Sequence, residues 1–311
     1  MAREIRLHDK VRKNLAARGD AGAVWLARLP DLVARLEAEW KIKVGRTFPN
    51  ATEAYVAEAV ADDGTELALK IPIVGVEKAE REILFLEAAA GRGYVRLVGT
   101  DRESGAMLLE RLGPQLAQMG LPIEEQMAIL CATLKEAWMK ALPGVRLLTG
   151  AEKAAQTGLT IERAWPKLIA SRPDAMLEMA RRFVRARHDA FDPDTAVVAH
   201  GDAHGWNTLH DPKTGGYKFV DPEGLFIERA HDVAISMREW PAEFLVGDAA
   251  SLGRKRCALL ARLSGADETA IWQWGYLETL VNGLLYTESR QDELAAGFLD
   301  VAEAWSRADY F

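Results

Sequence analysis

The chain has 311 residues, 49% of them hydrophobic and 27% charged, which suits a globular protein of two domains or one large two-lobed unit. Its net charge of −7 argues against a nucleic-acid partner, because nucleic-acid binders usually present a basic face. Without an apolar leader, an 18-residue apolar run or paired cysteine spacings, the chain is expected to be a cytoplasmic monomer with no membrane partner.

The N-terminal part of the chain begins with a helix pattern and then changes to strand patterns. In residues 22–40, Leu and Val recur at spacings of three and four, which predicts an amphipathic helix. We assign residues 1–41 to an N-terminal helical extension. Residues 55–60 and 66–71 are then predicted as two strands, joined by the hairpin turn Asp62-Asp63-Gly64.

The next elements complete a small sheet with one helix, which we assign to residues 42–113. Residues 45–52 are rich in turn formers and would cap the phosphates of a nucleotide. Residues 77–90 are strong helix formers that end at glycines. Two more strands are predicted at residues 95–100 and 106–110.

The character of the chain changes after Gly113-Pro114. Residues 123–140 and 176–191 are predicted as amphipathic helices, and the chain is helix-rich from residue 230 onward. The only strands expected in this part are residues 197–199, 207–209 and 217–220. The expected fold is therefore α+β, with a small sheet lobe followed by a larger, mainly helical lobe at residues 114–311.

Two short segments of the larger lobe carry the most specific chemistry. Residues 200–207 read His-Gly-Asp-Ala-His-Gly-Trp-Asn, and residues 221–224 read Asp-Pro-Glu-Gly. Asp202 follows an apolar strand, and its Asp-x-x-x-x-Asn spacing occurs in the catalytic loops of protein kinases. Such a carboxylate can orient a hydroxyl and take its proton, while Asn207 and Asp221 offer oxygen ligands to Mg²⁺. A polar hairpin between the two segments should bring these ligands together.

Other side chains around the two segments are expected to support the loop or to meet a substrate. A histidine before the base can fix the loop backbone, and a carboxylate near the start of a helix can accept backbone N–H groups. The residues assigned to this group are His200, His204, Trp206, Glu223 and Asp232.

Nucleotide contacts are expected in the smaller lobe. Lys70 ends a strand and can reach the α- and β-phosphates if a carboxylate of the 77–90 helix holds it. Periodicity does not choose among the three candidate carboxylates, which are Glu80, Glu82 and Glu87. The extended connector that includes Glu110 and Leu112 offers backbone groups to an adenine edge.

These residues together resemble the aminoglycoside phosphotransferases, in the branch that holds the streptomycin 6-kinases and the hydroxyurea-type resistance kinases. The resemblance implies a two-lobed, protein-kinase-like fold and phosphorylation of an antibiotic hydroxyl with ATP and Mg²⁺. It spans nearly the whole chain and is carried by residues 25–30, 48–49, 55–56, 69–70, 95–97, 108–111, 200–207 and 221–224.

The resemblance also assigns roles to individual residues. Asp202 is similar to the family's catalytic base, and Asn207 and Asp221 match its Mg²⁺ ligands. Lys70 matches the phosphate-binding lysine. The resemblance alone favours Glu82 as the partner of Lys70, since it precedes Ile-Leu-Phe-Leu as the family's helix glutamate does.

Departures from the family pattern concern the substrate. Ala203 replaces a larger apolar residue, residues 50–52 lack the usual glycines, and Trp206 could crowd the site or pack on a substrate. Streptomycin-like substrates carry guanidinium groups, which need carboxylates and aromatic faces. The candidate suppliers are Trp240, Trp274, Glu278, Asn282 and Glu288.

Two questions stay open at the level of sequence. Residues 266–311 hold nine acidic and two basic residues, a net −7, which predicts either a solvated helical surface or an acidic wall that attracts a cationic substrate. The expected activity is phosphorylation of an aminoglycoside. The alternatives are a metabolic kinase of a sugar or amino alcohol and a non-catalytic nucleotide-binding scaffold.

Overall fold

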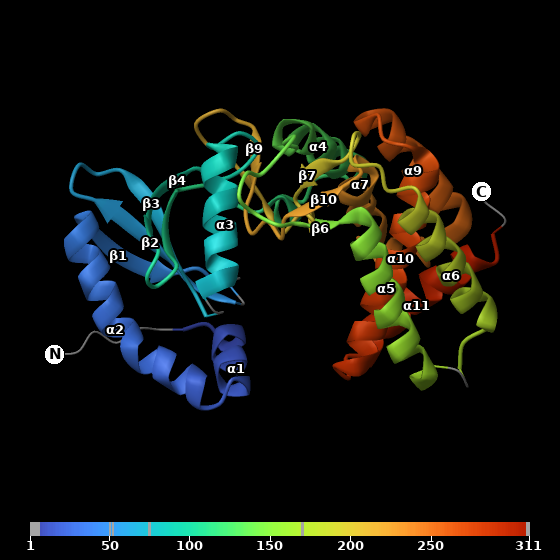
Figure 1. The fold of residues 1–311 in the computed structure, drawn as a ribbon, viewed down its shortest axis with the longest axis horizontal. Helices are drawn as coiled ribbons and strands as arrows, with labels where there is room; N and C mark the ends of the chain where they lie inside the picture. Colours follow the sequence, from blue (N-terminus) through green and yellow to red (C-terminus); the bar gives the residue numbers. More distant parts are fainter. Residues whose placement is uncertain (1–6, 50, 52, 74–75, 169–170, 309–311) are drawn as a thin grey trace. The chain divides into compact units, whose positions relative to one another are not determined.

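The chain folds into two compact units, Met1–Gly113 and Pro114–Phe311 (Figure 1). The computed structural model describes residues 7–49, 51, 53–73, 76–168 and 171–308. Residues 50 and 52, part of the expected phosphate-capping turn, and Asp309 of the acidic C-terminal segment lie outside the described residues.

Unit 1 is built on a five-stranded antiparallel sheet with the order β1-β2-β3-β5-β4. Its strands are β1 (Ile42–Thr47), β2 (Ala54–Ala61), β3 (Glu66–Pro72), β4 (Leu97–Asp101) and β5 (Ala106–Glu110). The β2–β3 hairpin closes at Gly64, whose φ of 85° suits glycine, and Asp63 accepts the backbone N–H of Thr65 at 2.9 Å. The hairpin places Lys70 opposite Val56, and the pairing of β3 with β5 places it opposite Met107 on the other side.

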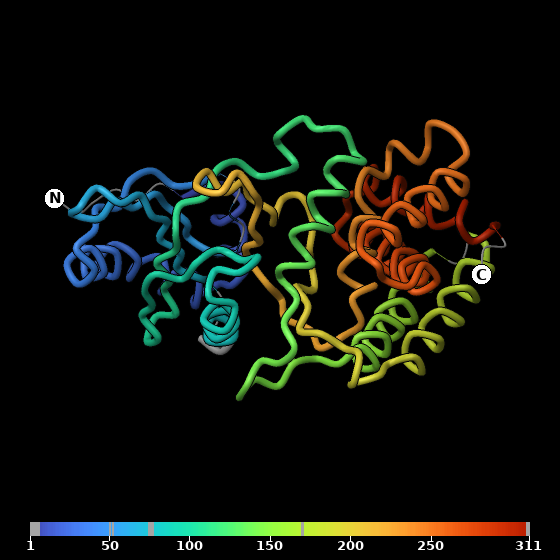
Figure 2. The backbone as a smooth tube through the Cα atoms, turned by 90° about the horizontal axis from the view of Figure 1, so that it is seen from above, coloured from blue at the N-terminus to red at the C-terminus, as the bar shows by residue number. Residues whose placement is uncertain are grey.

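The helices of unit 1 are α1 (Asp9–Ala17), α2 (Asp20–Trp40) and α3 (Val76–Ala89). Leu29, Val33 and Leu36 recur at helical spacing on α2 and are fully buried in one cluster with strand residues such as Leu69 and Ile71. The expected N-terminal extension therefore shares the hydrophobic core of the sheet, as Figures 1 and 2 show for α2 alongside the strands.

Unit 2 is mainly helical and centres on α10 (Glu268–Glu288). Helix α10 packs against α5, α6, α7, α9 and α11, and residues 270–280 are all buried (Figure 1). A helix that is apolar around its whole circumference is a core helix. The surrounding helices are α4 (Ile123–Ala137), α5 (Gly150–Ala164), α6 (Asp174–Asp189), α7 (Arg229–Arg238), α8 (Pro241–Phe244), α9 (Ala249–Ser264) and α11 (Asp292–Ser306), with two 3-10 turns at Leu116–Gln118 and Trp165–Lys167.

The short strands of unit 2 form two small sheets, with the orders β6-β10-β7 and β8-β9. They are β6 (Leu148–Thr149), β7 (Val197–Ala199), β8 (Thr208–His210), β9 (Tyr217–Phe219) and β10 (Leu225–Ile227). The three strands expected here are present as β7, β8 and β9, but the expectation that they are the only ones was wrong, because β6 and β10 were missed. Strand β10 pairs with both β6 and β7 and so fixes the end of β7, where the catalytic-loop motif begins.

Two further features bear on the setting of the protein. Cys131 and Cys257 are buried free thiols, and burial raises the pKa of Cys131 to about 12. Such thiols are unreactive at neutral pH. Within the described residues, no helix is both long enough and apolar enough to cross a membrane.

Candidate active site

The loop that carries Asp202 leaves β7 through a tight turn at Gly201. Gly201 has a φ of 91°, and an added Cβ would lie 3.1 Å from the Cβ of Glu223 and 3.2 Å from the Cγ of Leu225. Glycine is needed for both reasons, since a side chain would be strained by the dihedral angle and crowded by these neighbours. Ala203, next in the loop, is fully buried, so the loop backbone beside Asp202 is packed against the interior.

The fully buried carboxylate of Asp232, near the start of α7, anchors this loop. It accepts the backbone N–H groups of His200 and Gly201, each at 2.8 Å, and the indole N–H of Trp138 at 3.1 Å. Burial alone would raise the pKa of Asp232, but its neighbour His231 and these N–H donors hold it below the ordinary value. Asp232 therefore binds the loop as a charged anchor.

Two histidines complete the loop, and their hydrogen bonds indicate the tautomers. The N–H of Asp202 donates to His200 Nδ1 at 3.1 Å, so His200 Nε2 carries the proton and donates to the carbonyl of Val220 at 2.9 Å. The N–H of Trp206 donates to His204 Nδ1, so His204 Nε2 donates to Asp202 Oδ2 at 3.2 Å. His200 thus fixes the loop, and His204 contacts the carboxylate of Asp202 itself.

The hairpin β8–β9 brings Asn207 and Asp221 to the same end. The backbone N–H of Val220 donates to the carbonyl of Asn207 at 2.9 Å, so Asp221 follows directly. The Asn207 amide donates through Nδ2 to the carbonyl of Asp202 at 3.1 Å, which leaves its oxygen as the acceptor end. Asp221 is exposed and adopts a left-handed φ of 56°.

This donor set fits Mg²⁺. One amide oxygen and one carboxylate are hard ligands, and Mg²⁺ commonly takes one or two such protein ligands, with phosphate oxygens and water supplying the rest. Over the described parts of the chain, no group of three His, Cys, Asp or Glu side chains forms a complete protein cage for a metal ion. A cation at Asn207 and Asp221 would therefore share its ligands with a nucleotide.

Arg238, which the sequence analysis missed, makes an ion pair with Oδ1 of Asp202. Its other nitrogen donates to Glu278 Oε2 at 2.7 Å, and Lys153 lies 3.3 Å from the other oxygen of Glu278. Burial would raise the pKa of Asp202, but the hydrogen bond from His204 and the charge of Arg238 hold it well below the usual range. No motif spacing signals Arg238, because it lies 36 residues from Asp202.

In unit 1, Lys70 is paired with Glu82 of helix α3. The Nζ atom of Lys70 lies 2.6 and 2.8 Å from the two carboxylate oxygens of Glu82, and both side chains are largely buried. The other two candidates on this helix, Glu80 and Glu87, bind Arg102 instead. The geometry therefore selects Glu82 from the three carboxylates that periodicity left open.

The expected adenine connector follows strand β5. Glu110, the last residue of this strand, is buried, and its side chain accepts the N–H of Arg96 at 2.8 Å. Its own N–H donates to the carbonyl of Arg96 at 3.0 Å. A role for Glu110 in nucleotide binding would therefore depend on its carbonyl group, while Leu112 lies beyond the end of the strand with its side chain buried.

Most of the residues expected to contact a substrate cation have internal partners instead. Trp274 is fully buried and donates to Glu228 at 2.8 Å, so it is a core residue. Glu288 is bound by Arg163 and Lys167, and Asn282 donates to the backbone of the helix that it lies on. These contacts argue against a substrate role for the three residues.

The remaining aromatic and acidic candidates differ in exposure. Trp206 is 47% exposed and lies in the loop that carries the base, and Glu223 is exposed as well. Trp240 is partly buried in a left-handed conformation, with the guanidinium of Arg256 5.8 Å from its ring centre. Of these residues, Trp206 has the large apolar surface that could pack on a ligand.

The acidic C-terminal segment is partly neutralised within the fold. Arg172 binds Asp300 at 2.6 Å and Glu303 at 2.9 Å. Asp267 caps the N-terminus of α10 through the N–H of Ala270. Together with the pairs of Glu278 and Glu288, these contacts favour a structural surface over a continuous acidic wall.

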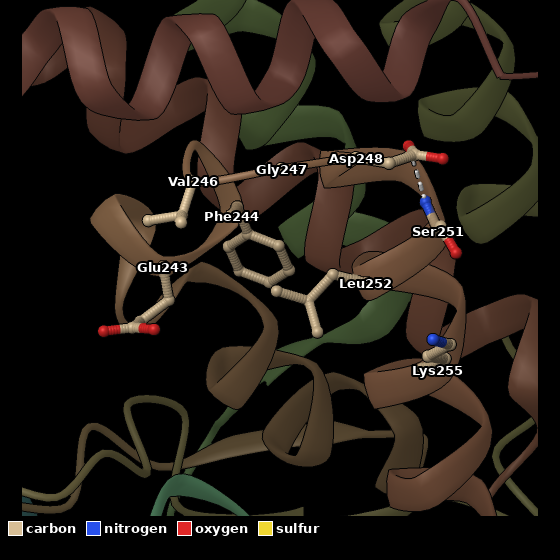
Figure 3. Close-up of a pocket in the computed structure, with 8 residues that line it drawn as sticks. All are labelled: Glu243, Phe244, Val246, Gly247, Asp248, Ser251, Leu252 and Lys255. Carbon is tan, nitrogen blue, oxygen red and sulfur yellow. Dashed lines mark hydrogen bonds between the residues drawn. The ribbon is translucent and has the colours of Figure 1, made fainter.

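A hollow of about 370 Å³ elsewhere in unit 2 lies between α8 and the start of α9 (Figure 3). Figure 3 shows the side chains of Phe244 and Leu252 facing each other there. Asp248 caps α9 beside them by accepting the N–H of Ser251 at 3.0 Å. None of the predicted site residues lines this hollow, so it is separate from the Asp202 loop.

Comparison with known proteins places this geometry in context. The profile of the aminoglycoside/hydroxyurea antibiotic resistance kinases matches residues 40–289. The chain is 28% identical to a streptomycin 6-kinase of Streptomyces griseus over 93% of each chain. The choline kinase LicA of Streptococcus pneumoniae has a similar structure, with a TM-score of 0.60 at 15% identity over 90% of this chain and all of that one. An amicoumacin kinase in complex with AMP-PNP and Ca²⁺ gives a TM-score of 0.56 at 14% identity, over 93% of this chain and 95% of that one. These likenesses confirm the expected kinase-like α+β fold.

Proposed function

The chain belongs to the aminoglycoside/hydroxyurea antibiotic resistance kinase family, and we propose that it transfers the γ-phosphoryl group of ATP to a hydroxyl of a cationic, streptomycin-like aminoglycoside. The observation that carries the proposal is the Asp202 loop, which is anchored by Asp232 and followed by the hairpin that brings Asn207 beside Asp221. A non-catalytic scaffold has no need of a carboxylate held in this way.

Asp202 orients the acceptor hydroxyl and takes its proton as the new P–O bond forms. The low pKa of Asp202 keeps the carboxylate ionised at neutral pH and also makes it a weak base. Phosphoryl transfer passes through a loose transition state in which the hydroxyl loses its proton late, so orientation is the larger part of this role. His204 donates to Oδ2 of this carboxylate.

The nucleotide contacts are assigned to both units. Asn207 and Asp221 would hold Mg²⁺, which when bound neutralises charge on the β- and γ-phosphates. Lys70, held by both oxygens of Glu82, would contact the α- and β-phosphates. The backbone at Glu110 and Leu112 would meet the adenine edge.

We assign the substrate cation to Glu239 rather than to Glu278 or Glu288. Glu239 follows Arg238 directly, and its charge acts on Asp202 and His204. Burial raises its pKa, and this outweighs the opposite effects of His204 and Arg238. Across the described residues, no hydrogen bond or ion pair engages its carboxylate. An arriving guanidinium or ammonium would give this carboxylate a direct ion pair, and the exposed ring of Trp206 could stack on the cation.

Turnover assays with different acceptors test the proposal. ATP consumption should depend on streptomycin, and mass spectrometry should find a phosphorylated product. Asp202→Asn should lower kcat by about 10²-fold or more while MgATP affinity survives, because the substitution keeps the shape of the residue and removes the base. Turnover with a sugar or amino alcohol and none with aminoglycosides would favour the metabolic kinase. MgATP binding without turnover on any acceptor would favour the scaffold.

We propose that the protein acts as a monomer in the cytoplasm, where ATP is available. Nucleic-acid and membrane partners have no part in it. The two buried free thiols suit a reducing compartment.

A further inference from the structure

The two oxygens of the Asp202 carboxylate are held by different side chains. Oδ1 is in an ion pair with Nη2 of Arg238, the last residue of α7. Oδ2 lies 3.2 Å from Nε2 of His204, in the loop itself. A hydrogen bond of 3.2 Å is at the long end of the normal range, so the His204 contact is the one that can more readily be shared.

Arg238 connects the base to the core of unit 2. Its Nη1 donates to Glu278 at 2.7 Å, and Glu278 lies on the buried helix α10. The side chains of Arg238 and Glu278 are only 12% and 7% exposed. The guanidinium therefore bridges a loop carboxylate and a core carboxylate, and it ties the position of Asp202 to the helix against which α5, α6, α7, α9 and α11 pack.

A buried charge bridge of this kind is not explained by stability alone. Removing charged groups from water costs free energy that apolar packing would avoid, so buried ion pairs add little net stability over apolar residues of similar volume. The planar fork of arginine can hold two carboxylates in fixed directions, which lysine cannot do. The arrangement is suited to fixing geometry.

We propose that Arg238 is the positioning residue of the phosphoryl transfer, holding Oδ1 of Asp202 so that Oδ2 takes the acceptor hydroxyl. This inference rests on the proposed function. Each carboxylate oxygen has two acceptor directions, so the hydroxyl can donate to Oδ2 while His204 keeps or yields its own contact. Arg238 touches neither the nucleotide nor the acceptor in this scheme and acts through Asp202.

The test compares Arg238→Met and Arg238→Lys with a matched control, Arg172→Met. Arg172 is similarly buried, with a side chain 15% exposed, and also bridges two carboxylates, those of Asp300 and Glu303. Arg238→Met should lower kcat by about 10²-fold, since a misplaced catalytic group costs that much, and should leave the KM for ATP within about twofold. Arg238→Lys should recover part of the loss, and Arg172→Met should keep the wild-type kcat.

A normal kcat in Arg238→Met, or an equal loss in Arg172→Met, would overturn the inference while leaving the proposed function in place. If Arg238→Met does not fold, the test relies on Arg238→Lys, which should fold and have a lower kcat than the wild type. If the wild type turns over no acceptor at all, the proposed function fails. Crystal structures of the wild type and the Arg238 variants then test the role of Arg238 without any turnover. If the Asp202 carboxylate has the same orientation in the variants as in the wild type, Arg238 does not position it.

Discussion

The carboxylates of unit 2 differ in whether the fold already supplies them with a cation. Glu278 is already paired with Arg238 and Lys153. Burial would raise the pKa of Glu278, but these positive charges outweigh it, so the pKa lies well below its ordinary value. Glu239, the neighbour of Arg238 in the chain, has its pKa shifted in the opposite direction by burial. A substrate cation gains more from a carboxylate that has no direct ion pair among the described residues, because it does not have to displace an internal cation.

Glu239→Gln should therefore raise the KM for a cationic acceptor by about tenfold, the effect of losing one charge-assisted hydrogen bond. The KM for ATP should stay the same. Steady-state kinetics with streptomycin measure both constants. Glu243→Gln, an exposed glutamate four residues further along, is the matched control and should change neither constant. An unchanged acceptor KM in Glu239→Gln would contradict the assignment.

Asp221→Asn should weaken Mg-dependent nucleotide binding more than it disturbs the fold. Asp221 has a φ of 56°, and asparagine tolerates this left-handed region better than most residues. Losing one anionic oxygen ligand should raise the Mg²⁺ concentration needed for half-maximal turnover by about tenfold or more. Turnover measured across a Mg²⁺ titration gives this value. ATP binding in EDTA serves as the control and should not weaken, whereas an unchanged Mg²⁺ requirement would exclude Asp221 as a ligand.

At the scale of elements, the β8–β9 hairpin holds the two expected Mg²⁺ ligands together, and Asp211 stabilises its turn. Asp211 is buried and accepts the N–H of Lys213 at 2.9 Å and the hydroxyl of Thr214 at 3.1 Å. Lys218 lies 3.3 Å away on the returning strand. Burial would raise the pKa of Asp211, but these donors outweigh it and hold the pKa below 3.8.

Asp211→Ala should lower the free energy of unfolding by about 1–3 kcal/mol at pH 7, because buried donors lose their acceptor. The folded-state pKa lies below the unfolded one, so this contribution is complete above about pH 4 and is lost as the pH falls through the folded value. Urea unfolding of both proteins at several pH values between 7 and 3 measures the difference. A difference that grows toward acid pH would contradict the role of the charged carboxylate.

Sequence patterns predicted the elements that are long or strongly punctuated. Helices α2 and α3 and the β2–β3 hairpin follow from periodicity and turn residues. Strands β6 and β10 were missed, although β7, β8 and β9 were predicted and are as short as β10, with three residues each. Both missed strands are defined by their pairing with each other, and β10 also pairs with β7. Helix α5 contains Gly150 and Gly158, which lower helix propensity, and its capping box at Thr149 and Glu152 compensates for them.

The site divides in the same way. Asp202, Asn207 and Asp221 follow from local spacing, since the loop and the hairpin are continuous in sequence. Arg238 could not be found this way, because its two partners lie 36 and 40 residues from it and meet it only through tertiary packing. A count of charged residues likewise does not show which acidic residues pair with an arginine or a lysine on another helix.

At the scale of the whole molecule, the residues proposed for the active site are supported by two separate cores. Lys70 and Glu82 lie in unit 1, where Leu36 of α2 is fully buried against the sheet cluster. Asp202 and its partners lie in unit 2, where Leu280 of α10 is fully buried. Units with their own cores open locally with their own free energies. A core mutation should therefore loosen only the unit that contains it.

Leu36→Ala and Leu280→Ala test this separation. Each should cost about 2–5 kcal/mol, because removing a buried leucine side chain leaves a cavity. Native-state hydrogen exchange should speed up by about 30-fold or more in residues 7–113 for the first variant and in residues 114–308 for the second. Leu159→Ala, at a leucine that is 71% exposed, is the control and should change neither unit. If either core mutation accelerated exchange equally in both units, the molecule would open as one cooperative body. Unfolding of the region around Lys70 and Glu82 could then not be separated from unfolding of the Asp202 loop.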